Sequence, residues 1–293
     1  MTERQIILVV DLPSITRRCF ASSEQAARTM NERLDITSPV LHIFATLIQR
    51  IRQKRELAGV VIALDSDESE RRGLFPAYKQ GRAERPAGYD EQLEKLLHCL
   101  SLIGWPIRDA IGWEADYVCG TVAFLMSDEF HVVVASTDKD MTQLLVNPGV
   151  HLWHPFQRDF VTPSTVREKY GVEPIQMRDF LALAGDSSDS IPGVKGVGAK
   201  HAARLLKAHG SIAQMIHAKP TTDKQLAAVQ ADPDHVRLMQ ELVGLNCTCP
   251  METFEVPTNV LPAWEHNVGV LGFEEPASRL HEALTAEREE LES

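Results

Sequence analysis

Residues 185–200 read Gly185-Asp186-Ser187-Ser188-Asp189-Ser190-Ile191-Pro192-Gly193-Val194-Lys195-Gly196-Val197-Gly198-Ala199-Lys200 and combine two features that bind charged groups. Asp186 and Asp189 lie three residues apart, so one turn of chain can point both carboxylates at one cation. The glycines that follow allow close approach to the backbone, and a basic helix predicted to begin near Ala199 presents free amides to a phosphate. A pair of metal ligands beside a phosphate clamp indicates an enzyme that cuts a nucleic-acid backbone.

The sequence before this stretch alternates between apolar runs and segments with helical periodicity. Continuous apolar runs predict strands buried on both faces, as in a parallel sheet, at residues 6–10, 59–64, 105–110, 131–136 and 151–153. Helical spacing of apolar residues predicts helices that begin at Ser38, Tyr89 and Gly112, and a short helix after residues 137–140. This alternation predicts an α/β fold with a mostly parallel central sheet flanked by helices, followed by a wholly helical part after Thr162.

The charge distribution matters more than the net charge of −11, which alone argues against nucleic-acid binding. Residues 66–88 are polar, too long for an ordinary connection, and carry a net charge of +4 between residues 71 and 86. Residues 192–218 carry four basic side chains and no acid. Two basic surfaces are therefore predicted on an acidic chain, whose acidic end after Glu282 is expected to be a solvated helix.

The composition also bounds the class of protein. The 293 residues are 44% hydrophobic, which is ample for a packed core, and no apolar run reaches the roughly 18 residues of a membrane span. Residues 1–10 lack the long apolar core and the cleavage site expected of a signal peptide, and the spacing of the five cysteines is poor for a zinc site. The sequence therefore predicts a cytoplasmic protein with no membrane contact.

Carboxylates cluster where the predicted strands end. Asp11, Asp65 and Asp138 each follow an apolar run, and ligands of open parallel sheets bind outside the carboxyl ends of the strands. Any one of these acids could simply cap a helix or a turn. The predicted set of eight is Asp11, Asp65, Glu114, Asp116, Asp138, Asp140, Asp186 and Asp189. Eight acids on one rim repel one another unless cations neutralise them, and all-oxygen donors favour two Mg²⁺ or Mn²⁺ ions, as in phosphodiester hydrolysis.

Several spaced segments resemble the 5′-nuclease family, which contains the 5′→3′ exonuclease domain of bacterial DNA polymerase I and the flap endonucleases of phages and cells. The segments are LFPAYKQGR at 74–82, GWEADYVCGTVA at 112–123, STDKDMTQLL at 136–145 and DFLALAGDSSDSIPGVKGVG at 179–198. Their order along the chain makes the resemblance specific. It implies an α/β nuclease core at 1–170 that includes a helical arch at 66–88. It also implies a helical part at 171–293 with a helix–three-turn–helix at about 186–210.

The resemblance implies a role for each site residue. Asp65, Glu114, Asp116 and Asp138, with Asp11, hold the first metal region, and Asp140, Asp186 and Asp189 hold the second. Lys79 and Arg82 lie near the scissile phosphate, and Arg72 is a further arginine of the arch. The helix–three-turn–helix grips the duplex backbone, with a K⁺ ion held by main-chain carbonyls, through Gly193, Lys195, Gly196, Gly198, Lys200, Arg204 and Lys207.

The resemblance implies a freestanding, monomeric, Mg²⁺-dependent nuclease of replication or repair, acting on DNA with a 5′ flap, a nick or a free 5′ end. Three residues depart from the family pattern: Leu12 where Gly is usual, Tyr117 where an acid is common, and Ser190 where Asn is common. Two alternatives stay open. Tyr117 leaves open a nuclease-inert DNA-binding relative that retains the backbone clamp, although the eight acids speak against it, and a small-molecule phosphatase on a similar sheet is the second alternative.

Overall fold

The computed structural model describes residues 4–30, 34–250, 279 and 282. The first half of the chain alternates strands with helices, in the order β1 (Ile6–Asp11), α1 (Leu12–Met30), α2 (Thr37–Arg52), β2 (Leu57–Ala63), α3 (Glu70–Leu74), α4 (Tyr89–Ile103), β3 (Ile107–Arg108), α5 (Ala115–Met126), β4 (His131–Ala135), the 3₁₀ helix η1 (Lys139–Val146), β5 (Val150–His154) and β6 (Asp159–Val161). The predicted α/β fold class is confirmed by this alternation.

The strands form one six-stranded sheet in the order β3-β2-β1-β4-β5-β6, with β6 antiparallel to β5 and the other neighbours parallel. Every residue of β1 is buried, as its continuous apolar run predicts. The chain reverses its direction of winding between β1 and β4, which pair through Val10 and Ala135. Ligands of such sheets bind at this switch point, beyond the carboxyl ends of the strands.

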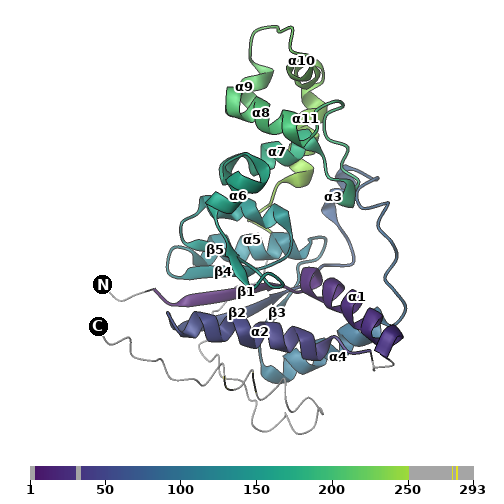
Figure 1. Ribbon diagram of the computed structural model, residues 1–293, viewed down its shortest axis with the longest axis vertical. Helices are drawn as coiled ribbons and strands as arrows, with labels where there is room; N and C mark the ends of the chain where they lie inside the picture. Colours follow the sequence, from purple (N-terminus) through teal and green to yellow (C-terminus); the bar gives the residue numbers. More distant parts are fainter. Residues whose placement is uncertain (1–3, 31–33, 251–278, 280–281, 283–293) are drawn as a thin grey trace.

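Helices cover both faces of the sheet (Figure 1). Leu8 and Val10 of β1 pack into a core shared with α1, α2 and α4, whereas Ile7 and Val9 pack into a second core shared with α5. The alternation follows from the two-residue repeat of a strand, which points successive side chains to opposite faces. Both faces are therefore sealed, and polar chemistry is confined to the ends of the strands.

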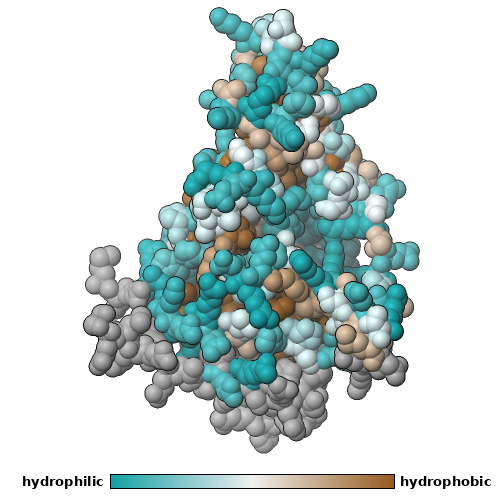
Figure 2. All heavy atoms as spheres, viewed as in Figure 1, coloured by the Kyte–Doolittle hydropathy of each residue, from teal (hydrophilic) through white to brown (hydrophobic). Residues whose placement is uncertain are grey.

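The second half of the chain is helical and forms its own apolar core. Its elements are α6 (Pro163–Tyr170), η2 (Pro174–Gln176), α7 (Met177–Ala184), η3 (Ser187–Asp189), α8 (Ala199–His209), α9 (Ile212–Ile216), α10 (Lys224–Ala231) and α11 (Pro233–Val243). Figure 1 shows these helices stacked beyond the α5 face of the sheet, narrowing to a tip at α9 and α10. On the face drawn in Figure 2, hydrophilic residues cover most of this tip.

Some elements differ from the expectations. Helix α1 was not predicted, although Leu12, Ile15, Cys19 and Phe20 follow the helical spacing and are buried. Within residues 66–88 only α3, five residues long, is α-helical, and the rest consists of turns, bends and irregular chain, so this segment is less helical than the resemblance implied. Among the described residues, no helix is both long and apolar enough to cross a membrane.

The expected division of the chain into residues 1–170 and 171–293 stays a prediction. Most of the last 43 residues belong to the ranges 251–278, 280–281 and 283–293, which lie outside the described residues. The solvated helix expected after Glu282 lies there as well. All of the predicted site residues, by contrast, lie between residues 11 and 207 and within the described ranges.

Candidate active site

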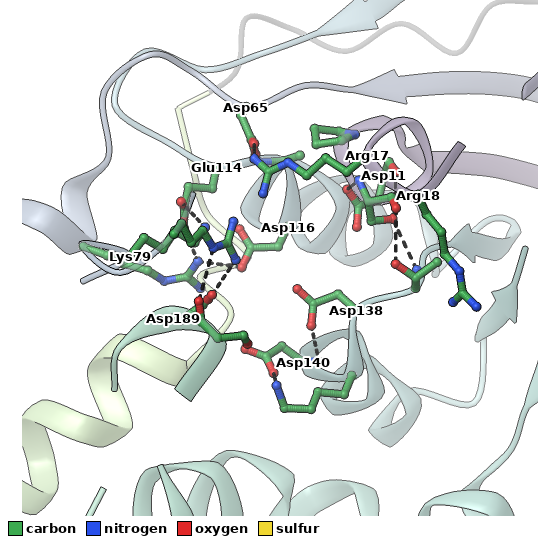
Figure 3. Close-up of a pocket in the computed structure, with 18 of the residues that line it drawn as sticks. Asp11, Arg17, Arg18, Asp65, Lys79, Glu114, Asp116, Asp138, Asp140 and Asp189 are labelled. Atoms are coloured by element: carbon green, nitrogen blue, oxygen red, sulfur yellow. Dashed lines mark hydrogen bonds and ion pairs between the residues drawn. The ribbon is translucent and has the colours of Figure 1, made fainter. Parts of the chain in front are cut away.

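A cleft of about 600 Å³ opens at the carboxyl ends of β1, β2 and β4, where the sheet faces the segment 66–88 and η3. Seven of the eight predicted acids line it, namely Asp11, Asp65, Glu114, Asp116, Asp138, Asp140 and Asp189. Asp11, Arg17 and Arg18 gather at one end of the cleft and Glu114, Lys79 and Asp189 at the other, with Asp116 and Asp138 between them (Figure 3). The structure thus brings together acids that are up to 178 residues apart in the chain.

Asp11 is buried at the end of β1 and held by neighbouring hydroxyl and amide groups. Ser136 donates its hydroxyl to Asp11 Oδ2 at 2.5 Å, and the backbone N–H of Ser14 donates to Oδ1 at 3.3 Å. Burial raises the pKa of Asp11 to about 7, against the hydrogen bond from Ser136 and with repulsion from Asp138, Asp65 and Asp116 adding to the rise. A nearby cation would stabilise the ionised carboxylate and lower this pKa.

Glu114 and Asp116, at the start of α5, share one guanidinium. Arg71 Nη1 lies 2.6 Å from Glu114 Oε2 and 2.7 Å from Asp116 Oδ2, and Lys79 forms a short ion pair with Glu114 Oε1. The hydroxyl of Tyr78 also donates to Glu114 Oε2, at 2.8 Å. Although burial opposes the change, Lys79 and Arg71 lower the pKa of Glu114 to about 2, so this carboxylate stays ionised. Burial dominates at Asp116 and raises its pKa.

The acids that follow β4 and α7 form the other side of the cleft. Asp140 is buried, and its pKa is raised well above the usual value by burial and by repulsion from Asp138. Asp186 does not line the cleft but accepts from Lys139 Nζ at 2.5 Å, and Lys139 Nζ also lies 3.7 Å from Asp140 Oδ1. Asp189 forms a short ion pair with Arg82. Lys139 therefore links Asp140, which follows β4, with Asp186, which follows α7, within the predicted second metal region.

Like Asp11, three further acids accept hydrogen bonds from amides at the start of a helix, and this role is compatible with a ligand role in each. Asp65 Oδ1 accepts from the first amide of α5 at 3.1 Å, and Oδ2 pairs with Arg17 at 3.2 Å. Asp138 accepts from the amide of Asp140 at 2.9 Å and caps η1, while Asp186 caps η3. Capping fixes the carboxylate beside the backbone and leaves its remaining lone pairs available to a ligand.

The basic segment 66–88 is fastened to the loop that carries Asp189. The amide of Lys79 donates to the carbonyl of Asp189 at 2.8 Å, and the amide of Gly81 donates to Ser190 Oγ at 3.3 Å. Lys79 and Arg82 both line the cleft, and their place beside a scissile phosphate stays a prediction. Arg72 does not line it: it is exposed and lines a neighbouring cleft of about 670 Å³ between residues 66–86 and Tyr89 at the start of α4. Arg71 occupies the place among the acids.

The predicted DNA-binding residues lie in the turn before α8 and along that helix, from Gly193 to Lys207 in its last turn. Lys195, Lys200 and Lys207 are exposed, and α8 begins at Gly198 without a side-chain cap, which leaves its first amides open. Arg204 instead forms a bidentate ion pair with Asp223, at 2.7 and 3.2 Å. The carbonyl of Gly193, one of the main-chain groups considered for K⁺, lies 2.8 Å from His235 Nε2.

The donors fit a hard divalent cation in kind and in charge, since every acid presents oxygen and none is interleaved with His or Cys. Asp140 Oδ1 is buried without a hydrogen-bond partner, so it fits the role of an oxygen donor to a cation. Within the described part of the chain, however, no three acidic, His or Cys side chains are yet close enough to hold one ion. Basic side chains of the protein itself neutralise the acids instead.

Sequence reasoning missed Arg71, Tyr78, Lys139 and Ser136. The first two lie in the same polar segment as Lys79 and Arg82, and their burial in a charged cleft depends on partners far along the chain. Ser136 was visible as the residue between the β4 apolar run and Asp138, where a hydroxyl can reach the neighbouring strand end. Spacing alone gave no reason to prefer Arg71 over Arg72.

A parallel sheet with an acid-lined cleft at its switch point, a basic segment over it and a glycine turn that opens a basic helix together define the 5′-nuclease fold. The family described as 5'-3' exonuclease, N-terminal resolvase-like domain, matches residues 6–171, and the 5'-3' exonuclease, C-terminal SAM fold, matches residues 172–261. The chain belongs to the 5'-3' exonuclease family.

The amino-acid sequence is similar to proteins of two lengths, long DNA polymerases and a flap endonuclease of about its own length. It is 31% identical over 252 residues to the thermostable DNA polymerase I of Thermus thermophilus and 30% identical over 259 residues to DNA polymerase I of Bacillus subtilis, covering 84% and 86% of the chain. The chain spans only 29% of the length of either polymerase. It is also 31% identical to the flap endonuclease Xni of Shewanella loihica over 84% of the chain and 93% of that protein.

Solved structures share the fold. A bacteriophage T5 D15 flap endonuclease, in a pseudo-enzyme-product complex with DNA and metal ions, superposes with a TM-score of 0.68 over 96% of this chain and 99% of its own. The catalytic core of Rad2 in complex with a DNA substrate superposes with a TM-score of 0.56 over 96% of this chain and 93% of its own. At 20% and 14% identity these likenesses concern the fold alone.

Proposed function

We propose that the protein is a structure-specific 5′ nuclease, with flap endonuclease and 5′→3′ exonuclease activity, that hydrolyses DNA phosphodiesters during replication or repair. The observation that carries this proposal is the cleft in which seven predicted metal ligands meet Lys79 and Arg82. Membership of the 5'-3' exonuclease family and the likeness to a flap endonuclease of similar length support it. Its substrate would be DNA with a 5′ flap, a nick or a free 5′ end, bound by a cytoplasmic monomer.

The acids would hold two Mg²⁺ or Mn²⁺ ions, with Asp11, Asp65, Glu114, Asp116 and Asp138 in the first region and Asp140, Asp186 and Asp189 in the second. When bound, such ions lower the pKa of a water and stabilise charge on the phosphate. The chain's own residues orient the phosphate. Lys79 supplies a point charge and Arg82 a planar fork that can grip two phosphate oxygens, once each leaves its acid partner.

The helical part would bind the duplex at a second surface, outside the cleft. Lys195, Lys200 and Lys207, with the amides around Gly193, Gly196 and Gly198, would contact phosphates of the backbone rather than base edges. Arg204 would join them after release from Asp223. A K⁺ ion at this turn and a role for Arg72, on the second cleft under residues 66–86, belong to the same proposal. Selectivity would then depend on the structure of the DNA rather than on its sequence.

The direct test is cleavage of a 5′-labelled flap duplex in Mg²⁺, in Mn²⁺ and in EDTA, beside Asp138→Ala and the control Asp128→Ala, an exposed acid outside the cleft. We expect cutting near the flap junction that requires the metal, is abolished in Asp138→Ala and is unchanged in Asp128→Ala. Tight flap binding without cutting would overturn the nuclease proposal in favour of an inert DNA-binding relative. Hydrolysis of small phosphate esters without flap binding would favour a phosphatase.

A further inference from the structure

Arg71 is the most enclosed basic side chain of the cleft. Its side chain is 3% exposed, compared with 13% for Lys79, 31% for Arg82 and 32% for Lys139. Lys79 and Arg82 come from a turn segment, so they can leave the acids when a substrate arrives. Arg71 lies in α3 and cannot leave without unpacking its surroundings. It is therefore a permanent charge inside the acid cluster.

Three kinds of contact fix the Arg71 guanidinium. Nη1 lies between the carboxylates of Glu114 and Asp116 at 2.6 and 2.7 Å, and Nη2 donates to the carbonyl of Gly244 at 3.1 Å. The guanidinium carbon lies 4.0 Å from the centroid of the Tyr117 ring, a distance typical of a cation–π contact. The residue that departs from the family pattern thus supports this arginine.

The contacts constrain the two acids in turn. Glu114 Oε2 accepts from both Arg71 and Tyr78, so the carboxylate cannot rotate freely. Asp116 is held through Oδ2 by Arg71 and through Oδ1 by the amide of Tyr117 at 2.9 Å. Groups that hold a ligand in one orientation are the common way in which proteins prepare a metal site before the ion arrives.

We propose that Arg71, supported by the Tyr117 ring, is a positioning residue that orients Glu114 and Asp116 for metal binding. This inference rests on the proposed function, because it assigns these two acids to a metal. A purely structural role is the competing explanation, since Arg71 also joins α3 to the end of α11 through Gly244. The two roles differ in what they do to metal affinity in a protein that is still folded.

The test measures Mn²⁺ binding without DNA, from the paramagnetic signal of free Mn²⁺, and then kcat and KM for flap cleavage at saturating Mg²⁺. The variants are Arg71→Met, Arg71→Lys and Tyr117→Leu, with Arg237→Met as the control, because Arg237 pairs with Asp234 on the exposed surface. Thermal unfolding monitored by circular dichroism shows which variants are folded. Tyr117→Leu leaves the acid partners of Arg71 in place and removes the ring beneath it, together with that ring's edge contact to Trp113. This variant therefore tests the inference even if Arg71→Met does not fold.

We expect Arg71→Met to lower Mn²⁺ affinity and kcat by about 10- to 100-fold, with KM for the flap within about threefold. Arg71→Lys should recover part of both losses, since it keeps the charge but not the fork, and Tyr117→Leu should show a smaller loss of the same kind. Unchanged or tighter Mn²⁺ binding in folded variants would overturn the inference. Failure of the wild-type protein to cut the flap would overturn only the proposed function, because Mn²⁺ binding is measured separately.

Discussion

Ser136 donates its hydroxyl to Asp11 Oδ2 at 2.5 Å, joining the carboxyl ends of β4 and β1 at the switch point of the sheet. The same hydroxyl accepts from the amide of Asp138 at 3.0 Å. One serine thus links Asp11 at the end of β1 with Asp138, which caps the helix after β4. The hydrogen bonds hold the Asp11 side chain in place, while burial makes ionisation of its carboxyl group unfavourable. The charge of Asp11 therefore affects the stability of the folded protein without metal.

Replacing Asp11 with Asn should flatten the pH dependence of stability. The folded-state pKa of about 7 lies above the ordinary 3.8, so this group's contribution is fully present below about pH 4 and is lost as the pH rises through 7. The loss is of the order of 4 kcal/mol. In EDTA at pH 8, urea unfolding should therefore show Asp11→Asn to be more stable than the wild type, by about 2–4 kcal/mol.

The control for this comparison is Asp128→Asn, which changes an exposed acid. It should leave the difference between pH 4.5 and pH 8 as in the wild type. An Asp11→Asn variant that is less stable than the wild type at pH 8 would show that the ionised carboxylate stabilises the metal-free protein, contrary to the argument. The same variant should lose nuclease activity, because an amide does not neutralise a metal.

The three glycines of the turn before α8 should differ in their tolerance of a methyl group. A Cβ at Gly193 would lie 2.7 Å from the carbonyl oxygen of Leu183, and the residue has φ of 65°. Gly196 has φ of 82° but nothing within 4 Å, and Gly198 has open space with φ of −79°. We expect Gly193→Ala to cost more than about 3 kcal/mol, Gly196→Ala about 1–2 and Gly198→Ala less than about 1.

Urea unfolding of the three variants tests this order. Gly196→Ala and Gly198→Ala should stay folded, so that their flap affinity reports on close approach of the backbone to DNA rather than on stability. Equal losses of stability at Gly193 and Gly198 would contradict the packing argument. The comparison separates the structural role of Gly193, whose neighbour Gly185 contacts it across the turn, from the predicted DNA contact of the other two.

The sequence predicted those parts of the site that local patterns determine. Asp11, Asp65 and Asp138 were predicted because each follows a buried apolar run, and the parallel sheet then brings strand ends together. Arg71 was not separated from Arg72, because the difference arises from tertiary contacts. Its partner Gly244 lies 173 residues further along the chain. No local pattern in a polar segment encodes such a contact.

The same distinction applies to secondary structure. The strands were predicted because burial on both faces makes each run apolar throughout. Helix α1 was overlooked because it carries only a narrow buried stripe on a polar chain. The turns at residues 79–82 are held by hydrogen bonds to the loop at 188–190, about a hundred residues further along the chain. Local sequence patterns do not reveal contacts at that separation.

Replacing Lys79 or Arg82 with Ala should slow cleavage more than it weakens binding. Each side chain reaches an acid of the cleft, and removing one preorganised group of this kind costs about 100- to 1,000-fold in rate. Single-turnover cleavage of the flap at saturating DNA gives the rate, and binding in Ca²⁺ gives the affinity. Lys95→Ala is the matched control, because Lys95 pairs with Glu91 on the exposed face of α4.

Arg82→Lys should recover only part of the loss, because an ammonium cannot grip two phosphate oxygens as a guanidinium does. Full activity of Lys79→Ala would mean that this lysine serves only to neutralise Glu114, whose pKa of about 2 partly depends on it. Loss of affinity equal to the loss of rate would instead place Lys79 in substrate binding. Either result would contradict the prediction that Lys79 acts mainly on the rate of cleavage.

Removing Lys195, Lys200 and Lys207 together should weaken flap binding and make it less dependent on salt. Each lysine is exposed near the start or along the length of α8, and each phosphate contact contributes about 0.9 to the slope of log K against log salt. The triple Ala variant should therefore lose roughly two to three from that slope, measured by fluorescence anisotropy between about 50 and 200 mM salt. An unchanged slope would show that the duplex binds elsewhere.

The ion pair between Arg204 and Asp223 can be tested with the same measurement of flap affinity against salt concentration. Arg204→Ala should change the affinity little, because the guanidinium is already engaged at 2.7 and 3.2 Å. Asp223→Asn keeps an oxygen that can accept from the amides of Gln225 and Leu226 at the start of α10 but removes the charge that holds Arg204. Flap affinity should then rise and the salt slope steepen by about one contact, because a fourth basic side chain becomes free to meet a phosphate. A fall in affinity would mean that Asp223 positions Arg204 for DNA rather than withholding it.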